Sequence, residues 1–132
     1  MSTVFSASLE HLHEMLRWIC NNTEVAFFSK KNKEQIELAA EEAIVNIIKH
    51  GYGKNPGTIE IECFLTDDED VELSFKDKGI PCNPLENTHS EGGSGVKLIL
   101  ALMDNVSYQR QGQYNILTMR KRVTTQMSTK PE

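Results

Sequence analysis

The sequence predicts an α+β two-layer sandwich, in which a mixed, mostly antiparallel sheet is covered on one face by helices. Three observations lead to this fold class. Two pairs of segments alternate between apolar and polar residues, as half-buried strands do, and each pair is joined by a short polar turn. Three other segments carry apolar residues at helical spacing. Along the chain these elements follow the order β-α-α-β-β-α-β-β, which favours a sheet with its helices on one side.

The length of the chain suits one domain. Its 132 residues are enough to bury roughly two-thirds of the surface that the unfolded chain exposes. No linker, internal repeat or low-complexity block divides the sequence. We expect a single domain over residues 1–123 and a disordered tail over residues 124–132.

The first half of the chain predicts one strand and two helices. Residues 3–7 suit a short edge strand. From Ser8, a good N-cap residue, leucine and isoleucine recur at helical spacing as far as about Cys20. After a loop, a long helix is expected over residues 33–50. Gly51 is expected to end that helix in the left-handed conformation.

The second half predicts two hairpins with a helix between them. The expected strands are, in order, residues 58–65, 71–79, 106–111 and 114–123. Residues 80–93 contain two prolines and two glycines and indicate a mobile loop. A helix follows over residues 95–104, with a glycine at its first position. Gly112 separates the last two strands and marks their turn.

The composition argues against several classes of partner. The formal net charge is −5, whereas nucleic acids and anionic membranes attract basic proteins. We therefore expect no direct contact with nucleic acid and no membrane partner. No apolar run approaches the ~18 residues of a membrane span, and the first residues lack a signal-peptide pattern. Three widely spaced cysteines fit neither a disulfide framework nor a zinc site, which favours a reducing cytoplasm.

The segment "EEAIVNIIKHGY", residues 41–52, places an asparagine in the most apolar part of the long helix. At 100° per residue, Glu42, Asn46 and Lys49 lie within about 60° of one another, and His50 borders the same stripe. A solvent-facing stripe is one interpretation. The other is a site for a hard cation and phosphates, because a carboxylate and an amide oxygen lie one turn apart.

Asp77 keeps the parity of the apolar residues in its strand, so it is expected to point toward the covered face. A carboxylate there is costly unless it accepts hydrogen bonds or lies at the edge of a pocket. Gly79, two residues on, allows the backbone to approach a flat ligand. The alternative is that the strand has already ended and residues 77–79 form a simple turn.

The segment "EGGSGVK", residues 91–97, contains a Gly-x-Gly pair at the start of a helix: Gly93, Ser94 and Gly95. Amide groups at a helix N-terminus attract phosphate. The spacing matches neither the P-loop nor the dinucleotide fingerprint. A flexible hinge is therefore an equally good interpretation, and Lys97 is more often a surface charge than a ligand.

Taken in order, "EEAIVNIIKHGY", "DKGIPCNP" and "EGGSGVKLILALMDNV" resemble the Bergerat, or GHKL, ATP-binding fold, which gyrase-type ATPases and histidine kinases share. Within that fold the chain is most similar to the small anti-sigma-factor serine kinases of the RsbW and SpoIIAB type. The resemblance covers about residues 3–123. It agrees with the two-layer architecture expected from the pattern of elements.

The resemblance implies roles for the site residues. Asn46 is expected to bind Mg²⁺ and Glu42 to act as the general base. Asp77 is expected to accept the amino group of adenine, with Gly79 beside the ring. Lys49 and His50 are expected to contact phosphate or ribose. The segment Gly93–Ser94–Gly95 is expected to close over the phosphates of ATP.

The resemblance also implies a function. The chain is expected to be a bacterial, cytoplasmic anti-sigma factor and ATP-dependent serine/threonine protein kinase. It would bind an RNA polymerase sigma factor, phosphorylate a STAS-domain anti-sigma-factor antagonist and form a homodimer. Its cofactors would be ATP and Mg²⁺.

Two alternatives stay open at the level of the sequence. One is a partner-sequestering module that binds ATP without significant kinase activity. The other is a relative of the catalytic domain of histidine kinases. The short segment of 13 residues between Ile80 and Gly92 favours the anti-sigma kinases over the histidine kinases, whose lids usually run longer.

Overall fold

The computed structural model describes residues 1–23, 29–66, 70–81, 83, 85 and 94–122. Within this part of the chain, five strands form one sheet with the spatial order β1-β2-β3-β5-β4, and all neighbouring pairs are antiparallel. The strands are β1 (Ser2–Ser6), β2 (Thr58–Leu65), β3 (Asp70–Asp77), β4 (Asn105–Gln111) and β5 (Tyr114–Arg122). The expected α+β fold class is confirmed.

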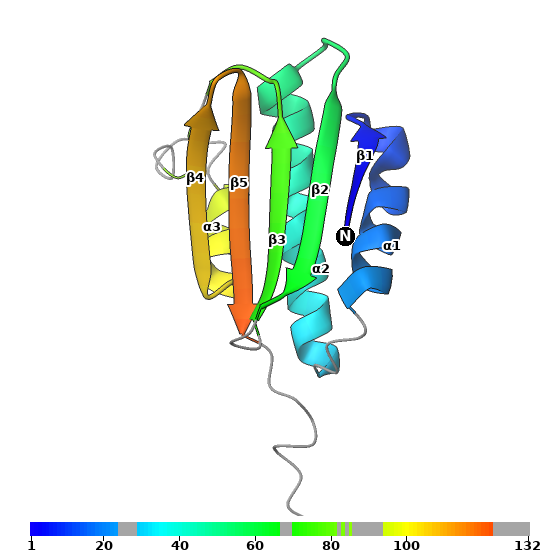
Figure 1. Ribbon diagram of the computed structural model, residues 1–132, viewed down its shortest axis with the longest axis vertical. Helices are drawn as coiled ribbons and strands as arrows, with labels where there is room; N and C mark the ends of the chain where they lie inside the picture. The colour runs from blue at the N-terminus through cyan, green and yellow to red at the C-terminus, as the bar shows by residue number, and fades with distance from the viewer. Residues whose placement is uncertain (24–28, 67–69, 82, 84, 86–93, 123–132) are drawn as a thin grey trace, which may run out of the picture.

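The helices lie behind the sheet in Figure 1 and cover one of its faces. They are the 3₁₀ turn η1 (Leu9–His11), α1 (Leu12–Thr23), α2 (Lys30–Asn46), the π-helix η3 (Ile47–Tyr52) and α3 (Ser94–Leu102). Helix α2 packs against both α1 and α3. The opposite face of the sheet carries no helix among the described residues and faces the viewer in Figure 1.

The core lies between the sheet and the helices, and strand alternation explains its composition. In β2, Ile59, Ile61 and Cys63 are buried, while the residues between them face the open side. The buried residues of β3 and β5 continue this layer, and the helices contribute small and branched residues to it. These are Val71, Leu73, Phe75, Leu117, Met119, Ile19, Ile36, Ala39, Ala40, Ala43, Ile44 and Ile99.

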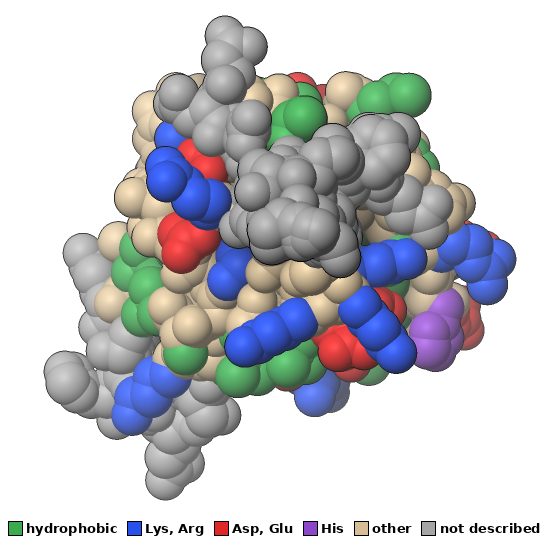
Figure 2. All heavy atoms as spheres, turned by 90° about the horizontal axis from the view of Figure 1, so that it is seen from below, with side chains coloured by type: hydrophobic (Ala, Val, Ile, Leu, Met, Phe, Trp, Pro, Cys, Tyr) green, Lys and Arg blue, Asp and Glu red, His purple; other side chains and the backbone are tan. Residues whose placement is uncertain are grey.

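The end of the sheet at which β3 begins and β5 ends carries paired charges. Arg120 donates a hydrogen bond to Glu72 at 2.7 Å, and the Nε atom of Arg122 lies 3.7 Å from Oδ1 of Asp70. Figure 2 views the molecule from this end. Basic and acidic side chains lie next to one another on its described surface, rather than in one basic patch.

The expected start of the second helix was wrong by three residues. Ser29 accepts a hydrogen bond from the backbone N–H of Asn32, at 3.1 Å, and α2 begins directly after it at Lys30. The N-cap bond, rather than the apolar pattern, decides this boundary, because it satisfies one of the free amide groups of the first turn. The end of the preceding helix also differs from the prediction: α1 runs on to Thr23, three residues beyond the predicted end.

Ser8 has the extended backbone of an N-cap residue, but its side chain caps no backbone N–H. Its hydroxyl instead forms a hydrogen bond with Nδ1 of His11, at 2.8 Å. A 3₁₀ turn over Leu9–His11 follows, and the α-helix begins only at Leu12. The prediction of a regular α-helix starting after Ser8 is therefore corrected.

The prediction that Gly51 ends the long helix was also wrong. After Asn46 the helix continues as a π-helix as far as Tyr52, and the N–H of Gly53 bonds to the carbonyl of Ile48 at 3.1 Å. Gly53, with φ of 63°, is the residue with the positive φ that ends the helix. Glycine suits this backbone because it has no Cβ to clash. Gly112 has φ of 60° and makes the turn between β4 and β5, as expected.

Several expectations fall outside the described residues. These are most of the loop at residues 80–93, including Cys82 and Gly93, and the tail at 124–132.

Candidate functional site

The candidate site lies at the upper end of the molecule in Figure 1, where α2 runs into the π-helix, β3 ends and β5 begins. Glu42 and Asn46 are half-buried, one turn apart on the last part of α2. Their spacing of four residues places the two side chains on the same face of the helix. Neither the carboxylate nor the amide makes a hydrogen bond to any other described residue.

Lys49 and His50 belong to the π-helix and are exposed. The helical period changes after Asn46, because the hydrogen bonds of a π-helix join residues five apart. The 100° rotation that grouped Lys49 with Glu42 and Asn46 therefore does not extend to it. Single π-helical turns inside α-helices occur frequently at functional sites.

Asp77 is the last residue of β3, and its side chain points to the covered face as predicted. It is only 5% exposed. Its Oδ1 atom accepts hydrogen bonds from the backbone N–H of Gly79, at 2.8 Å, and from Nδ2 of Asn115, at 3.0 Å. The carboxylate is thus held in a fixed orientation in spite of the cost of burying it.

Gly79 and Gly51 bring the strand and the π-helix into backbone contact. The N–H of Ile80 donates to the carbonyl of Gly51 at 3.0 Å. A Cβ atom on Gly79 would lie 2.6 Å from that same carbonyl oxygen, so only glycine fits there. A Cβ on Gly51 would lie 3.6 Å from Oδ1 of Asp77. The turn after β3 is therefore fixed directly beside the end of the helix that carries Asn46.

Asn115 is a member of the site that the sequence analysis missed. It lies opposite Asp77 in the β3–β5 register, and it is 6% exposed. Its Nδ2 atom donates to Asp77, to the carbonyl of Gly79 at 3.2 Å and to the carbonyl of Ile80 at 3.0 Å. A signal was present in the sequence, because Asn115 keeps the parity of the buried Leu117 and Met119.

A cavity of about 410 Å³ opens beside this turn. Among the described residues its walls are the end of the π-helix with the loop after it, and the turn after β3. They comprise Gly51, Tyr52, Asn55, Pro56, Gly57, Thr58, Lys78, Gly79 and Ile80. The cavity thus shares Gly51 and Gly79 with the surroundings of Asp77, whereas Glu42 and Asn46 do not line it.

Ser94 and Gly95 form the first turn of α3, so the helix begins at the Gly-x-Gly pair as predicted. Helix α3 packs against α2, with Val96 and Ile99 buried. Helix α3 therefore lies against the helix that carries Glu42 and Asn46. Gly93 lies outside the described residues.

Over the described parts of the chain, no three side chains of His, Cys, Asp or Glu gather closely enough to hold a metal ion by themselves. No described helix combines the length and the apolar character needed to cross a bilayer.

The fold and the site together define the class of protein. A family model described as the histidine kinase-like ATPase domain matches residues 5–121. The match covers nearly the whole chain, so the chain belongs to this family. The resemblance inferred from the sequence motifs is confirmed at the level of the family.

Within this family, the chain is similar to relatives named serine-protein kinase RsbW and anti-sigma F factor. The chain is 32% identical over 108 residues to the serine-protein kinase RsbW of Oceanobacillus iheyensis, an alignment that covers 70% of this chain and 66% of the relative. It is 30% identical over 83 residues to an anti-sigma F factor of the same organism, covering 54% of this chain and 56% of the relative. The chain thus spans less than two thirds of the length of these relatives.

A solved structure supports the fold. The RsbU and RsbW domains of a Mycobacterium tuberculosis protein match with a TM-score of 0.69 at 16% identity, covering 93% of this chain and 32% of that one. At this identity the likeness concerns the fold alone. It agrees with a sheet that is covered on one face by helices.

Proposed function

We propose that this chain is an ATP-dependent serine/threonine protein kinase that also acts as an anti-sigma factor. It binds an RNA polymerase sigma factor and, with ATP and Mg²⁺, phosphorylates a STAS-domain antagonist of that anti-sigma activity. The likeness to RsbW and anti-sigma F factor supports the proposal. Two further expectations from that likeness belong to it: a homodimer and a site of action in the bacterial cytoplasm.

The observation that carries the proposal is the pair Glu42 and Asn46. Both side chains lie on one face of α2, and both lack hydrogen-bond partners among the described residues. An amide oxygen suits Mg²⁺, which prefers oxygen ligands and keeps several of its waters. Such an ion, when bound, neutralises phosphate charge. Mg²⁺ would therefore have one protein ligand, the amide oxygen of Asn46, and its other ligands would be phosphate oxygens and water.

The roles of the residues are those that the resemblance to the family implies. Asp77 accepts the amino group of adenine, while Gly79 leaves room for the ring. Lys49, His50 and the segment Gly93–Ser94–Gly95 contact the phosphates or ribose. Glu42 accepts the proton of the serine or threonine hydroxyl as its oxygen bonds to the γ-phosphorus. The bond from that phosphorus to the bridging oxygen of ADP breaks, and ADP leaves with the electron pair.

The test is phosphorylation of the STAS proteins encoded in the same genome, with Mg-ATP and with intact mass to locate the phosphate. We expect one phosphate on a serine or threonine of one antagonist. Stable binding of a sigma factor or antagonist without phosphorylation would instead favour a sequestering module. Acid-labile phosphate on a histidine of a partner would point to a histidine-kinase relative.

Glu42→Gln gives a sharper prediction about the mechanism. The substitution keeps the size and polarity of the side chain but removes the base, so the rate of phosphotransfer should fall at least ~100-fold. Affinity for ATP should stay within about threefold of the wild type, because no nucleotide contact is assigned to Glu42. Glu41→Gln, one residue earlier and about 100° around the helix, is the matched control and should keep full activity. Unchanged phosphotransfer in Glu42→Gln would contradict the assigned base.

A further inference from the structure

We propose that Asn115, Tyr108 and Arg110 are positioning residues that hold the Asp77 carboxylate and the turn at Gly79 in the orientation that selects adenine. The inference rests on the proposed function, because it assumes that Asp77 accepts a hydrogen bond from the base of the nucleotide. It adds three residues from β4 and β5 that none of the sequence motifs contains. None of the three is assigned to a reacting group.

Asp77, Asn115 and Arg110 form a row across β3, β5 and β4. Asp77 lies opposite Asn115 in the β3–β5 register, and Asn115 lies opposite Arg110 in the β4–β5 register. Tyr108, two residues before Arg110, points to the same covered face. Its hydroxyl donates a hydrogen bond to Oδ1 of Asn115. The Nη1 atom of Arg110 donates to that same oxygen, at 3.2 Å.

The chemistry of the partners determines the orientation of the Asn115 amide. The guanidinium of Arg110 has donors only, so it must face the oxygen of the amide. The Asp77 carboxylate and the two backbone carbonyls of Gly79 and Ile80 are acceptors, so they must face the nitrogen. Turning the amide by 180° would place donor against donor and acceptor against acceptor. Asn115 therefore has one permitted orientation, set by residues on both sides.

The orientation of the Asn115 amide determines which carboxylate oxygen of Asp77 is left to accept a hydrogen bond from a ligand. Oδ1 already accepts from Asn115 and from the N–H of Gly79. Oδ2 accepts no hydrogen bond from the residues that the structure describes. A ligand group that meets Asp77 must therefore donate a hydrogen bond to Oδ2. The exocyclic amino group of adenine satisfies this requirement, whereas the carbonyl oxygen of a 6-oxopurine does not.

Arg110 fixes the turn in a second way. Besides Asn115, its Nη1 atom donates to the carbonyl of Gly79 at 3.3 Å, and its Nε atom donates to the carbonyl of Gly112 at 3.0 Å. One planar guanidinium thus connects the β4–β5 turn with the turn after β3. Lysine cannot reproduce this pattern, because it lacks the rigid fork of donors.

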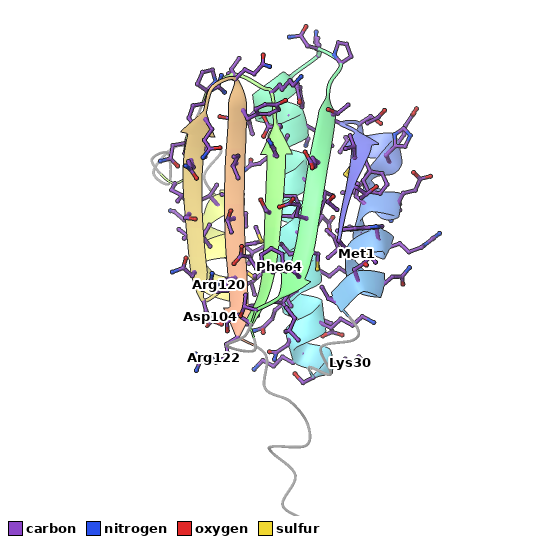
Figure 3. The ribbon with its side chains drawn as sticks, in the orientation of Figure 1. Met1, Lys30, Phe64, Asp104, Arg120 and Arg122 are labelled. Carbon is purple, nitrogen blue, oxygen red and sulfur yellow. The ribbon has the colours of Figure 1, made fainter. Side chains whose placement is uncertain are left out.

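The experiment compares the affinity of the full chain for ATP and for inosine triphosphate, which has a carbonyl oxygen in place of the amino group. The wild type should prefer ATP at least tenfold. Tyr108→Phe and Arg110→Ala should each lower that preference roughly three- to tenfold, as the loss of one hydrogen bond implies. Arg110→Lys should recover little of the loss. Arg120→Ala is the matched control, because Arg120 lies at the far end of the sheet in Figure 3 and pairs with Glu72.

A double-mutant cycle separates positioning from a general effect on folding. If Tyr108 acts through Asn115, Tyr108→Phe should not change the ATP preference further in an Asn115→Leu background. Arg110→Ala should keep only the part of its effect that comes from its direct bond to the carbonyl of Gly79. Asn115→Leu removes one donor from Asp77 and from the carbonyls of Gly79 and Ile80, and it can unfold the protein. The single variants Tyr108→Phe and Arg110→Ala decide the question in that case.

The outcomes distinguish the inference from the proposed function. A wild type that prefers ATP, together with variants that lose affinity for both nucleotides equally, would overturn the positioning role and leave the proposed function standing. A wild type that binds neither nucleotide would overturn both. If the wild type binds ATP and inosine triphosphate equally, Asp77 does not select the amino group of adenine.

Discussion

At the scale of single residues, the site depends on polar groups whose partners are distant in the chain. Asp77 is held by Asn115, which lies 38 residues away. The parity of Asp77 in its strand was enough to predict a buried carboxylate. It was not enough to show what satisfies that carboxylate, because the partner depends on the register between β3 and β5.

Gly79 gives a prediction at the same scale. Replacing it by alanine places a Cβ atom 2.6 Å from the carbonyl oxygen of Gly51. Backbone cannot move aside as cheaply as a flexible side chain, so we expect a loss of roughly 1–3 kcal/mol in the free energy of unfolding. Urea denaturation measures the loss.

The control for Gly79→Ala is Gly112→Asn. A Cβ on Gly112 meets no heavy atom within 4 Å, and asparagine tolerates a positive φ better than most residues. We expect this variant to keep nearly all of the wild-type stability. Equal losses at the two positions would mean that glycine flexibility, rather than the close approach to Gly51, explains the effect at Gly79.

At the scale of the elements, the π-helix connects α2 to the sheet. Tyr52, its last residue, donates a hydrogen bond to the carbonyl of Thr58 at 2.6 Å and accepts one from the N–H of Lys78 at 2.8 Å. Its ring lies against Gly57, where a Cβ would come within 2.2 Å of a ring carbon. The end of the helix is therefore fixed both to the start of β2 and to the turn after β3.

Tyr52→Phe tests this connection. The substitution keeps the ring but leaves the carbonyl of Thr58 and the N–H of Lys78 without their partner, so we expect a loss of roughly 1–3 kcal/mol in the free energy of unfolding. Amide exchange at Lys78 should become faster. Tyr114→Phe is the control and should change stability by less than about 0.5 kcal/mol. Its ring, which the substitution keeps, lies 4.4 Å from the ammonium of Lys76, and its hydroxyl has no hydrogen-bond partner among the described residues. Unchanged exchange at Lys78 in Tyr52→Phe would show that the π-helix is held in place by packing alone.

At the scale of the whole molecule, the buried Cys63 makes stability depend on pH. Cys63 is the last buried residue on the core face of β2, and burial raises the pKa of its thiol from the ordinary 9.0 to about 11. Between these values the unfolded thiol is ionised while the folded thiol keeps its proton. The stabilising contribution is complete below about pH 9 and is lost as the pH rises through about 11.

Urea denaturation at pH 7, 9, 10 and 11 checks this prediction. The wild type should lose more stability over that range than Cys63→Val, which cannot ionise and keeps an apolar side chain of similar size. Subtracting the two curves removes the contributions of other groups that titrate in the same range. If the two proteins lose stability in parallel, the thiol does not contribute.

The sequence predicted local features well, and the reasons are physical. Strand alternation identified β2 and β3 to within one or two residues, because one buried face imposes a period of two. The parity of Asp77 and the spacing of Glu42 and Asn46 are likewise local. The helix boundaries were less accurate, since the cap at Ser29 and the end at Gly53 depend on hydrogen bonds and dihedral angles that hydropathy does not encode.

The sequence by itself determined the fold class, the order of the elements and the three motifs of the candidate site. Only the tertiary structure decided how those motifs are held: the contact of Gly51 with Gly79, the π-helix after Asn46 and the row of Asp77, Asn115 and Arg110. Each of these joins segments that are far apart in the chain. Local preference cannot specify such contacts, because they form only when strand register and helix packing bring the segments together.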